Sequence, residues 1–311
     1  MVRTRKFSVV LVLMALASLT LAGSAALAGS PGDAGLLFLR MGVGAREAAM
    51  GGAGVASSQG ASAVFWNPAN NVFADFQTVL VLQHYDYLSI AGHESAAVAH
   101  RVGRGVVGFS FTGLYFDEQQ RYGDDGVAVP AGTFSPYDVA FGLSYARPLG
   151  KSFAVGANAK MVYEKVDLYS DSGLALDLFV THRARIQGLV FAASATNLGG
   201  KMDLNAGSFS LPTAYRLGAA YSPPALLDGR FTATCDMVFP NDTTEKAHVG
   251  AEMWLIPELV LRVGSALNYD MKGWTAGLGC RLERVGIDYA YEDNRIAGFD
   301  AGHKFSVQFT W

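Results

Sequence analysis

Charged residues are scarce in this chain of 311 residues. Asp, Glu, Lys and Arg together make up 16% of it, whereas hydrophobic residues make up 50%. A soluble domain carries about 25% charged residues. Beyond the N-terminal segment there is no apolar run of about 18 residues, which excludes a membrane-spanning helix. This combination is typical of a chain that meets lipid through the alternating residues of β-strands.

Cysteine is also rare, since the chain contains only Cys235 and Cys280. An exported chain is able to pair two cysteines in a disulfide. We expect them instead on separate strands that are not neighbours, where both face lipid as small apolar side chains. The formal net charge of −3 gives no indication of nucleic-acid binding.

The first 28 residues have the pattern of a secretory signal peptide. Three basic residues precede an apolar run over 7–22, and the Ala-Leu-Ala triplet at 26–28 has the spacing that signal peptidase prefers. A transmembrane anchor is the alternative, but the run is short for a span and no stop-transfer charges follow it. We therefore predict an exported chain from which residues 1–28 are removed.

The last residues form a strand that ends on an aromatic side chain. Large apolar residues at 305, 307, 309 and 311 alternate with Lys304 and three polar residues. A strand of this kind must bury its apolar face in a core or in lipid. The pattern resembles the C-terminal strand of outer-membrane barrels, which implies that Phe305, Phe309 and Trp311 are recognised by the barrel-assembly machinery.

Alternation of this kind continues through most of the chain after residue 77. In 137–147, for example, Val139, Phe141 and Leu143 face one way while Ala140 and Gly142 face the other. We predict an all-β fold, a transmembrane antiparallel β-barrel of about 14 strands over 78–311. The segments lie near 79–87, 94–102, 105–115, 137–147, 152–164, 173–181, 188–197, 213–222, 230–239, 246–255, 258–267, 272–282, 285–292 and the C-terminus.

The lengths of the predicted connections agree with a barrel in the outer membrane. The outer connections 116–136, 198–212 and 293–301 are longer than inner ones such as 148–151 and 283–284. An open β-sandwich also alternates, but its water-facing side carries charge, whereas here the second face is largely Gly, Ala and Ser. Closing the sheet also satisfies every strand edge, as lipid requires.

Residues 29–77 do not alternate and are rich in Gly, Ala and Ser. A short helical stretch is expected around Ala45–Met50. Aromatic residues such as Phe65 and Trp66 argue against a disordered tail. We predict that this segment is a plug that folds into the barrel lumen.

Two runs in the plug resemble a known family. LRMGVGAREAAMGGAGVA at 39–56 and ASAVFWNPA at 61–69 resemble the opening of the PorV/PorQ family of FadL-like outer-membrane proteins. The match is carried by Arg46, Met50, Gly51, Gly52, Trp66, Asn67 and Pro68. The Asn-Pro-Ala triplet is a turn initiator, so its role is either purely structural or that of a gate on a ligand path.

Charged residues of both signs are predicted to face the lumen. Such charges must pair or be hydrated. A salt-bridge network between plug and wall is one interpretation, and a selectivity lining for a polar solute is the other. The residues are Lys160, Glu164, Asp177, Arg216, Asp236, Glu252, Arg262, Arg281, Asp288 and Glu292.

The sequence contains no pattern that indicates catalysis. The six histidines lack close metal-ligand spacing, and there is no nucleophile elbow or phosphate-binding loop. Asp124-Asp125-Gly126 lacks the other ligands of a calcium loop and predicts a turn. We therefore expect a non-enzymatic protein without a cofactor or a metal.

Three functions are compatible with these features in a protein of the bacterial outer membrane. The PorV/PorQ resemblance implies a type IX-like secretion carrier that binds exported cargo and secretion-machine subunits through its outer loops. The alternative is a FadL-like transporter of hydrophobic small molecules, which needs an apolar pocket beside the plug. A structural barrel is the third.

Overall fold

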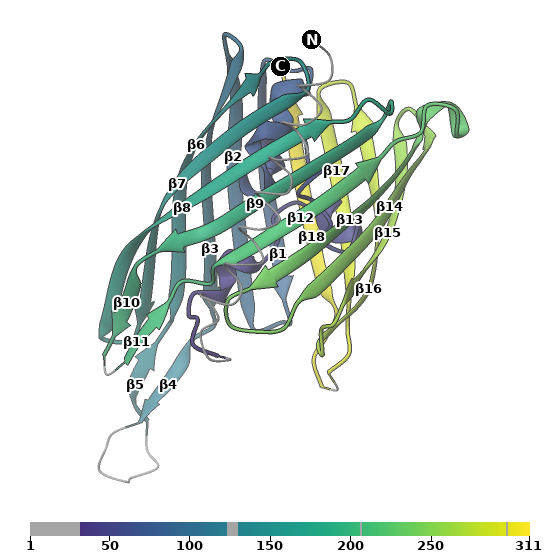
Figure 1. Ribbon diagram of the computed structural model, residues 1–311. Helices are drawn as coiled ribbons and strands as arrows, with labels where there is room; N and C mark the ends of the chain where they lie inside the picture. Colours follow the sequence, from purple (N-terminus) through teal and green to yellow (C-terminus); the bar gives the residue numbers. More distant parts are fainter. Residues whose placement is uncertain (1–31, 123–129, 206, 297) are drawn as a thin grey trace.

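The computed structural model in Figure 1 describes residues 32–122, 130–205, 207–296 and 298–311. The predicted signal peptide (1–28) and the predicted turn at 124–126 lie outside these ranges. Within them, fourteen strands form one closed antiparallel barrel, so the predicted fold class is confirmed. The strands are β1 (Thr78–Tyr87), β2 (Ala91–Val102), β3 (Gly105–Phe116), β6 (Tyr137–Leu149), β7 (Phe153–Val166), β8 (Tyr169–Arg183), β9 (Leu189–Gly199), β12 (Ala214–Tyr221), β13 (Phe231–Pro240), β14 (Lys246–Ile256), β15 (Leu259–Leu267), β16 (Lys272–Leu282), β17 (Val285–Asn294) and β18 (Gly302–Thr310).

The barrel closes where its first strand pairs with its last. Leu80 of β1 lies opposite Phe309 of β18, and His84 lies opposite Phe305. Every other strand pairs with its sequence neighbour, except that β3 joins β6 and β9 joins β12 across longer connections. Closure supplies hydrogen-bond partners to both outermost strands, which the apolar interior of a membrane requires.

The predicted faces of the strands are confirmed where β6 crosses the wall. Leu143 and Tyr145 are 65% and 50% exposed on the outer surface, whereas Gly142 and Ser144 are buried toward the lumen. Cys235 and Cys280 are free thiols on β13 and β16, with β14 and β15 between them. The exterior is therefore apolar because alternate residues along each strand are apolar.

Two further hairpins extend the wall at one end of the barrel. β4 (Gln119–Tyr122) pairs with β5 (Pro130–Phe134), and β10 (Lys201–Leu204) pairs with β11 (Gly207–Ser210). The sequence predicts loops in both regions, 116–136 and 198–212, so the two hairpins are a correction. These short strands pair only with each other beyond the apolar part of the wall, so lipid imposes no alternation on them.

The connections differ in length between the two ends of the barrel. The end that carries the C-terminus, at the top in Figure 1, has short turns such as 103–104, 257–258 and 283–284. The other end carries the long connections 117–136 and 200–213. Short periplasmic turns and long outer loops are typical of outer-membrane barrels, so we assign the C-terminal end to the periplasm.

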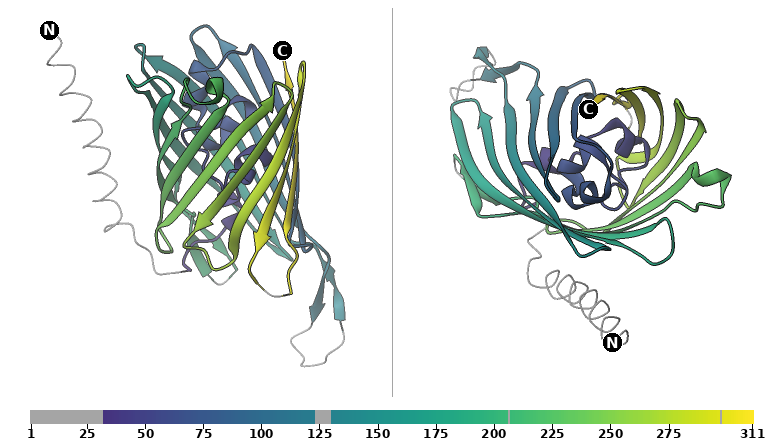
Figure 2. Two further views of the ribbon diagram at one scale, coloured as in Figure 1. Left: turned by 90° about the vertical axis from the view of Figure 1, so that its right-hand side faces the viewer. Right: turned by 90° about the horizontal axis from the view of Figure 1, so that it is seen from above.

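The N-terminal segment lies inside the barrel and passes along it. Its helical turns are η1 (Leu37–Arg40), α2 (Ala45–Ala49), η2 (Gly60–Ser62), α3 (Ala63–Trp66) and η3 (Pro68–Phe73), while η4 (Leu227–Gly229) lies in a periplasmic loop. Viewed along the barrel in Figure 2, these turns fill part of the ring of strands. The segment starts beside Asp242, whose carbonyl accepts from Gly32, and leaves the barrel where Gln77 donates to the Trp311 carbonyl. No helix in the described ranges is long and apolar enough to cross a membrane.

The plug packs against the wall through five apolar clusters in the described part of the chain, and two of them are larger than the rest. Near the outer end, Leu36 and Phe38 are buried with Val162, Met202 and Leu211. Near the periplasmic end, Val64 is buried with Val79, Val81 and Val106. Each of these two clusters joins plug residues to several strands, so the plug and barrel share one core.

Glycines in the wall allow the plug backbone to approach closely. Gly250 of β14 and Gly264 of β15 are register partners that face the lumen. A Cβ atom on Gly264 would overlap the backbone of Met50 and Gly51, and one on Gly250 would overlap Met50. Gly51 itself has a φ of 70°, which favours glycine. This pair therefore forms a flat contact surface for the plug.

We predict that Gly264→Leu displaces the plug, because the overlapping atoms belong to backbone and cannot rotate away. The free energy of unfolding should fall by about 2 kcal/mol or more. Urea unfolding from lipid vesicles measures this. Gly200→Leu is the matched control, since a Cβ there meets no atom within 4 Å. Equal stability of the two variants would contradict the contact.

Candidate functional site

The indole of Trp66 organises the middle of the plug. Its Nε1 donates to the Val43 carbonyl at 2.6 Å, and its ring covers Gly42 and Gly54 so closely that a Cβ on either glycine would collide with it. The guanidinium of Arg216 lies 5.1 Å from the centre of the Trp66 ring. Trp66 therefore holds two plug segments together and supports a cation from the wall.

Asn67 is fully buried and its amide is saturated with hydrogen bonds. Nδ2 donates to the Val55 carbonyl at 3.0 Å and to Thr181 Oγ1 of β8 at 2.9 Å, while Oδ1 accepts from Ala69 N at 3.1 Å. The last bond caps η3, which Pro68 begins. These contacts favour the structural role of the Asn-Pro-Ala triplet over the gating role.

An ion-pair ladder formed by Arg46, Glu252, Arg262, Asp288 and Arg281 crosses from the plug to four adjacent strands. Arg46 of α2 binds Glu252 of β14 through two bonds of 2.9 and 3.1 Å. Arg262 of β15 binds Glu252 at 2.7 Å and Asp288 of β17 at 2.7 Å. Arg281 of β16 completes the ladder with two bonds of 2.9 Å to Asp288. Each carboxylate is thus shared between two guanidinium groups.

The ladder depends on a small residue in the strand that it crosses. Arg262 and Asp288 lie on strands separated by β16, where Gly279 stands between them. A Cβ on Gly279 would contact the carboxylate of Asp288 and the guanidinium of Arg262. The glycine therefore leaves the space through which the two charged groups meet.

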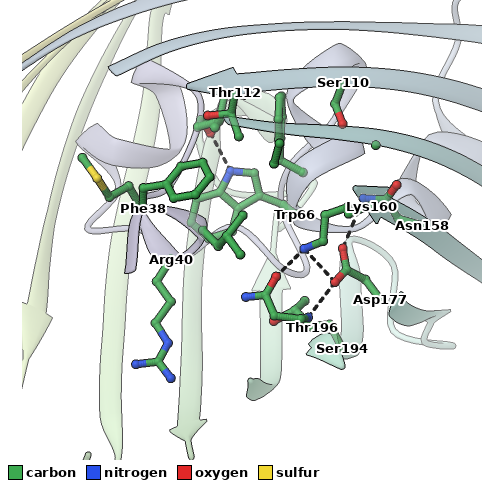
Figure 3. Close-up of a pocket in the computed structure, with 18 of the residues that line it drawn as sticks. Phe38, Arg40, Trp66, Ser110, Thr112, Asn158, Lys160, Asp177, Ser194 and Thr196 are labelled. Atoms are coloured by element: carbon green, nitrogen blue, oxygen red, sulfur yellow. Dashed lines mark hydrogen bonds and ion pairs between the residues drawn. The ribbon is translucent and has the colours of Figure 1, made fainter. Parts of the chain in front are cut away.

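A second polar cluster lies on the opposite wall, at an irregularity in strand pairing. The register between β8 and β9 shifts between Leu176 and Leu178. The side chain of Asp177 bonds to the neighbouring strand there, because its Oδ1 accepts a hydrogen bond from the backbone N of Asn197 at 2.7 Å. The same oxygen forms an ion pair with Lys160 Nζ at 2.8 Å. The carboxylate therefore accepts a backbone bond where the strand pairing is irregular. Figure 3 shows Asp177 beside Lys160.

The other residues predicted to line the lumen lie outside these two groups. Glu292 pairs with Lys304 at 3.4 Å, and Asp236 accepts from the backbone N of Val55 at 3.0 Å. Arg216 covers Trp66, and Glu164 lies on the lumen face of β7 apart from both groups. Nine of the ten residues thus form plug-to-wall bonds, form wall-to-wall bonds or place a cation on an aromatic ring. Glu164 belongs to none of these groups, since its Oε2 has no hydrogen-bond partner among the described residues.

Two basic residues at the site were not selected from the sequence. Arg40 of η1 pairs with Asp242 at 2.6 Å and donates to Asn241 Oδ1 at 2.8 Å, which ties the plug to the β13–β14 turn. Lys304 donates to the Gly42 carbonyl at 3.0 Å and lies 4.1 Å from the Tyr85 ring centre. Lys304 alternates with the outward-facing Phe305, so its position already indicated the lumen.

The plug leaves an outer cavity of about 570 Å³ at the end with the long loops. Apolar and aromatic side chains from the plug, the strands and the outer connections line it, namely Leu37, Met41, Tyr85, Leu88, Val238 and Met271. Charged groups, including Arg40, Lys304 and Glu292, border the same cavity.

Two smaller pockets of about 70 and 40 Å³ lie deeper, on the two sides of the Trp66 region. Arg40, Gly42 and Arg216 border the outer cavity and both of these pockets. Figure 3 shows the larger of the two beside Trp66 and Lys160. The segment around Gly42 therefore separates a large outer space from two small inner ones.

A further cavity of about 390 Å³ opens at the periplasmic end. The ladder residues Arg46, Glu252 and Arg281 line it, and in the described part of the chain it shares no lining residue with the outer cavity. The plug and the ladder thus stand between the two. Among the described residues, no three or more His, Cys, Asp or Glu side chains are grouped so as to hold a metal ion.

Comparison with known proteins identifies the fold. No protein-family model and no curated protein match the sequence. The toluene transporter TbuX of Ralstonia pickettii is similar in structure, with a TM-score of 0.60 and 15% identity over 87% of this chain and 98% of that one. A monoaromatic hydrocarbon channel, CymD, gives 0.59 and 13% over 87% and 98%, and a FadL homologue from Pseudomonas aeruginosa gives 0.58 and 11% over 86% and 98%. At these identities the likeness shows a shared fold.

The shared fold bears on two expectations from the sequence. A closed barrel of fourteen strands with an apolar exterior and a plugged lumen is an outer-membrane architecture, and the chain is located in the bacterial outer membrane. The similar structures are transporters and channels rather than enzymes. Neither the PorV/PorQ assignment nor the type IX secretion role finds support in these comparisons, which agree better with the transporter alternative.

We predict that Glu252→Gln loosens the plug. The amide cannot neutralise Arg46 and Arg262, so each of these guanidinium groups is left with one carboxylate partner, Glu47 and Asp288 respectively, at a cost of about 3 kcal/mol. The urea midpoint for unfolding from lipid vesicles should fall accordingly. Glu258→Gln, in an exposed periplasmic turn, is the matched control. If both variants unfold with the wild-type midpoint, the ladder does not hold the plug.

Proposed function

We propose that this chain is a transporter that carries hydrophobic small molecules across the outer membrane. The observation that carries the proposal is the outer cavity beside the plug, about 570 Å³ in volume. Binding sites for small molecules commonly measure about 300–1,000 Å³ and combine apolar walls with a few polar groups. Leu37, Met41 and Met271 provide such walls.

The position of this cavity supports uptake from outside the cell. It lies at the end with the long loops, where a molecule from the medium first meets the barrel. The apolar side chains of Leu37 and Met41 belong to the plug itself, so a bound molecule contacts the element that closes the lumen. Binding and passage are thereby linked through the same segment.

Passage beyond the cavity requires part of the plug to move. The inner pockets of about 70 and 40 Å³ hold little more than water, so a larger ligand stops at the segment around Gly42. Three anchors hold this segment: the Arg40–Asp242 pair, the bond from Lys304 to the Gly42 carbonyl, and the bond from Trp66 to the Val43 carbonyl. Movement here, with the ladder intact below, would connect the cavity to the inner pockets.

The side chains of the outer cavity and the ligands named for the similar structures both indicate which class of molecule would bind. The related structures include a toluene transporter and a monoaromatic hydrocarbon channel. Tyr85 and Met271 offer an aromatic ring and a polarisable thioether to such a molecule. A neutral aromatic hydrocarbon is therefore the first ligand to test, with a long-chain fatty acid as the second.

We predict that Leu37→Asp weakens toluene binding to the purified protein by about fivefold, since partial contact with a leucine side chain contributes about 1 kcal/mol. Uptake of labelled toluene by cells that express the variant should fall as well. Leu226→Asp is the matched control, because Leu226 is similarly exposed (47% against 55%) but lies in a periplasmic loop.

Equal toluene affinity of the Leu37→Asp and Leu226→Asp variants would show that the outer cavity is not the binding site. Failure of the wild-type protein to bind either toluene or a fatty acid would contradict transport of hydrophobic molecules altogether. The structural-barrel hypothesis would then be the better account.

A further inference from the structure

The two ends of the barrel differ in charge. At the outer end, Asp167, Asp203, Asp242, Asp270 and Asp300 belong to five different connections. At the periplasmic end, three consecutive turns contain basic residues and no acidic ones. These turns join β2 to β3 (102–105), β6 to β7 (147–152) and β8 to β9 (183–188). Because the six strands are adjacent in the wall, the turns form one continuous basic arc.

The basic side chains of this arc are exposed and available. Arg104, Arg147, Lys151 and Arg185 are exposed, and none of them forms an ion pair with another described residue. Arg183 also belongs to the arc but lies 5.3 Å from the ring centre of Phe73 in the plug. The first four therefore have no internal partner that explains their charge.

Each turn of the arc also presents one exposed aliphatic residue. Val102, Leu149 and Ile186 are 53%, 53% and 59% exposed. Each lies within two residues of a basic side chain, at the rim of the apolar exterior. An aliphatic side chain beside a cation suits the boundary between acyl chains and head groups, where the long basic side chains extend to the head groups.

The rest of the periplasmic rim lacks this arrangement. The turns that join β12 to β13, β14 to β15 and β16 to β17 contain Asp228, Glu258 and Glu283. Acidic residues there offset Arg230 and Arg284. The unbalanced positive charge is thus confined to one side of the barrel, from β2 to β9.

We propose that this basic arc binds the phosphate groups of anionic phospholipids in the periplasmic leaflet. Guanidinium groups bind phosphate oxygens in pairs, and a lysine adds a point charge. Basic residues next to an anionic lipid surface each strengthen binding, and they do so within a short distance of the surface. The aliphatic residues contact the first carbons of the acyl chains of the same lipids.

The test compares the lipids that stay bound to the full-length protein in mild detergent. Native mass spectrometry follows a titration with dioleoylphosphatidylglycerol and, separately, with dioleoylphosphatidylcholine, which has the same acyl chains but no net charge. The wild-type protein should bind phosphatidylglycerol more tightly. The triple variant Arg104→Gln, Lys151→Gln, Arg185→Gln, with one change in each turn, should lose about tenfold in phosphatidylglycerol affinity and little in phosphatidylcholine affinity.

A matched control separates the arc from total charge. Lys165→Gln, Lys201→Gln, Arg295→Gln removes the same charge from exposed residues at the outer end and should keep the preference. Equal affinity of the wild-type protein for both lipids, or equal loss in both triple variants, would overturn the proposal. If the first triple variant does not fold, its three single variants should each show a partial loss, and an unchanged preference in all three would overturn the proposal too.

Discussion

The hydrogen bonds between β1 and β18 are the interaction on which the rest of the structure depends. They close the sheet, and closure is what allows fourteen strands to stand in lipid without an unpaired edge. Closure also fixes a lumen, whose walls then face the plug. The alternation of side chains, with Leu143 outside and Ser144 inside, follows from the same constraint.

The lumen is filled by two kinds of contact that complement each other. Where the plug backbone meets the wall, glycines such as Gly250 and Gly264 remove side chains so that the surfaces touch. Where charges are buried, they share partners, as Glu252 does between Arg46 and Arg262. The tight packing and the ladder occupy the middle of the barrel, so the remaining space is divided into an outer and a periplasmic cavity. This division is what makes a ligand site, rather than an open pore, the natural interpretation.

The sequence predicted the barrel well because lipid imposes a rule on every residue of a spanning strand. All fourteen segments were located, and alternation placed Glu252 and Arg262 on the lumen side. It did not predict their partners, because Arg46 and Glu252 are 206 positions apart and meet only through the path of the plug. The β10–β11 hairpin and the anchor at Arg40 were missed for a related reason. Both lie at the outer mouth, where neither lipid nor a regular period constrains the residues.

A crystal structure grown with bromobenzene tests directly whether the plug leaves a binding cavity for hydrophobic molecules at the outer mouth. The bromine marks its position by anomalous scattering. We predict a bromine peak inside the outer cavity, between Leu37 and Met41 of the plug and Met271 of the β15–β16 connection, with the ladder unchanged. Bromine found only on the lipid-facing exterior, with the cavity occupied by water, would contradict it.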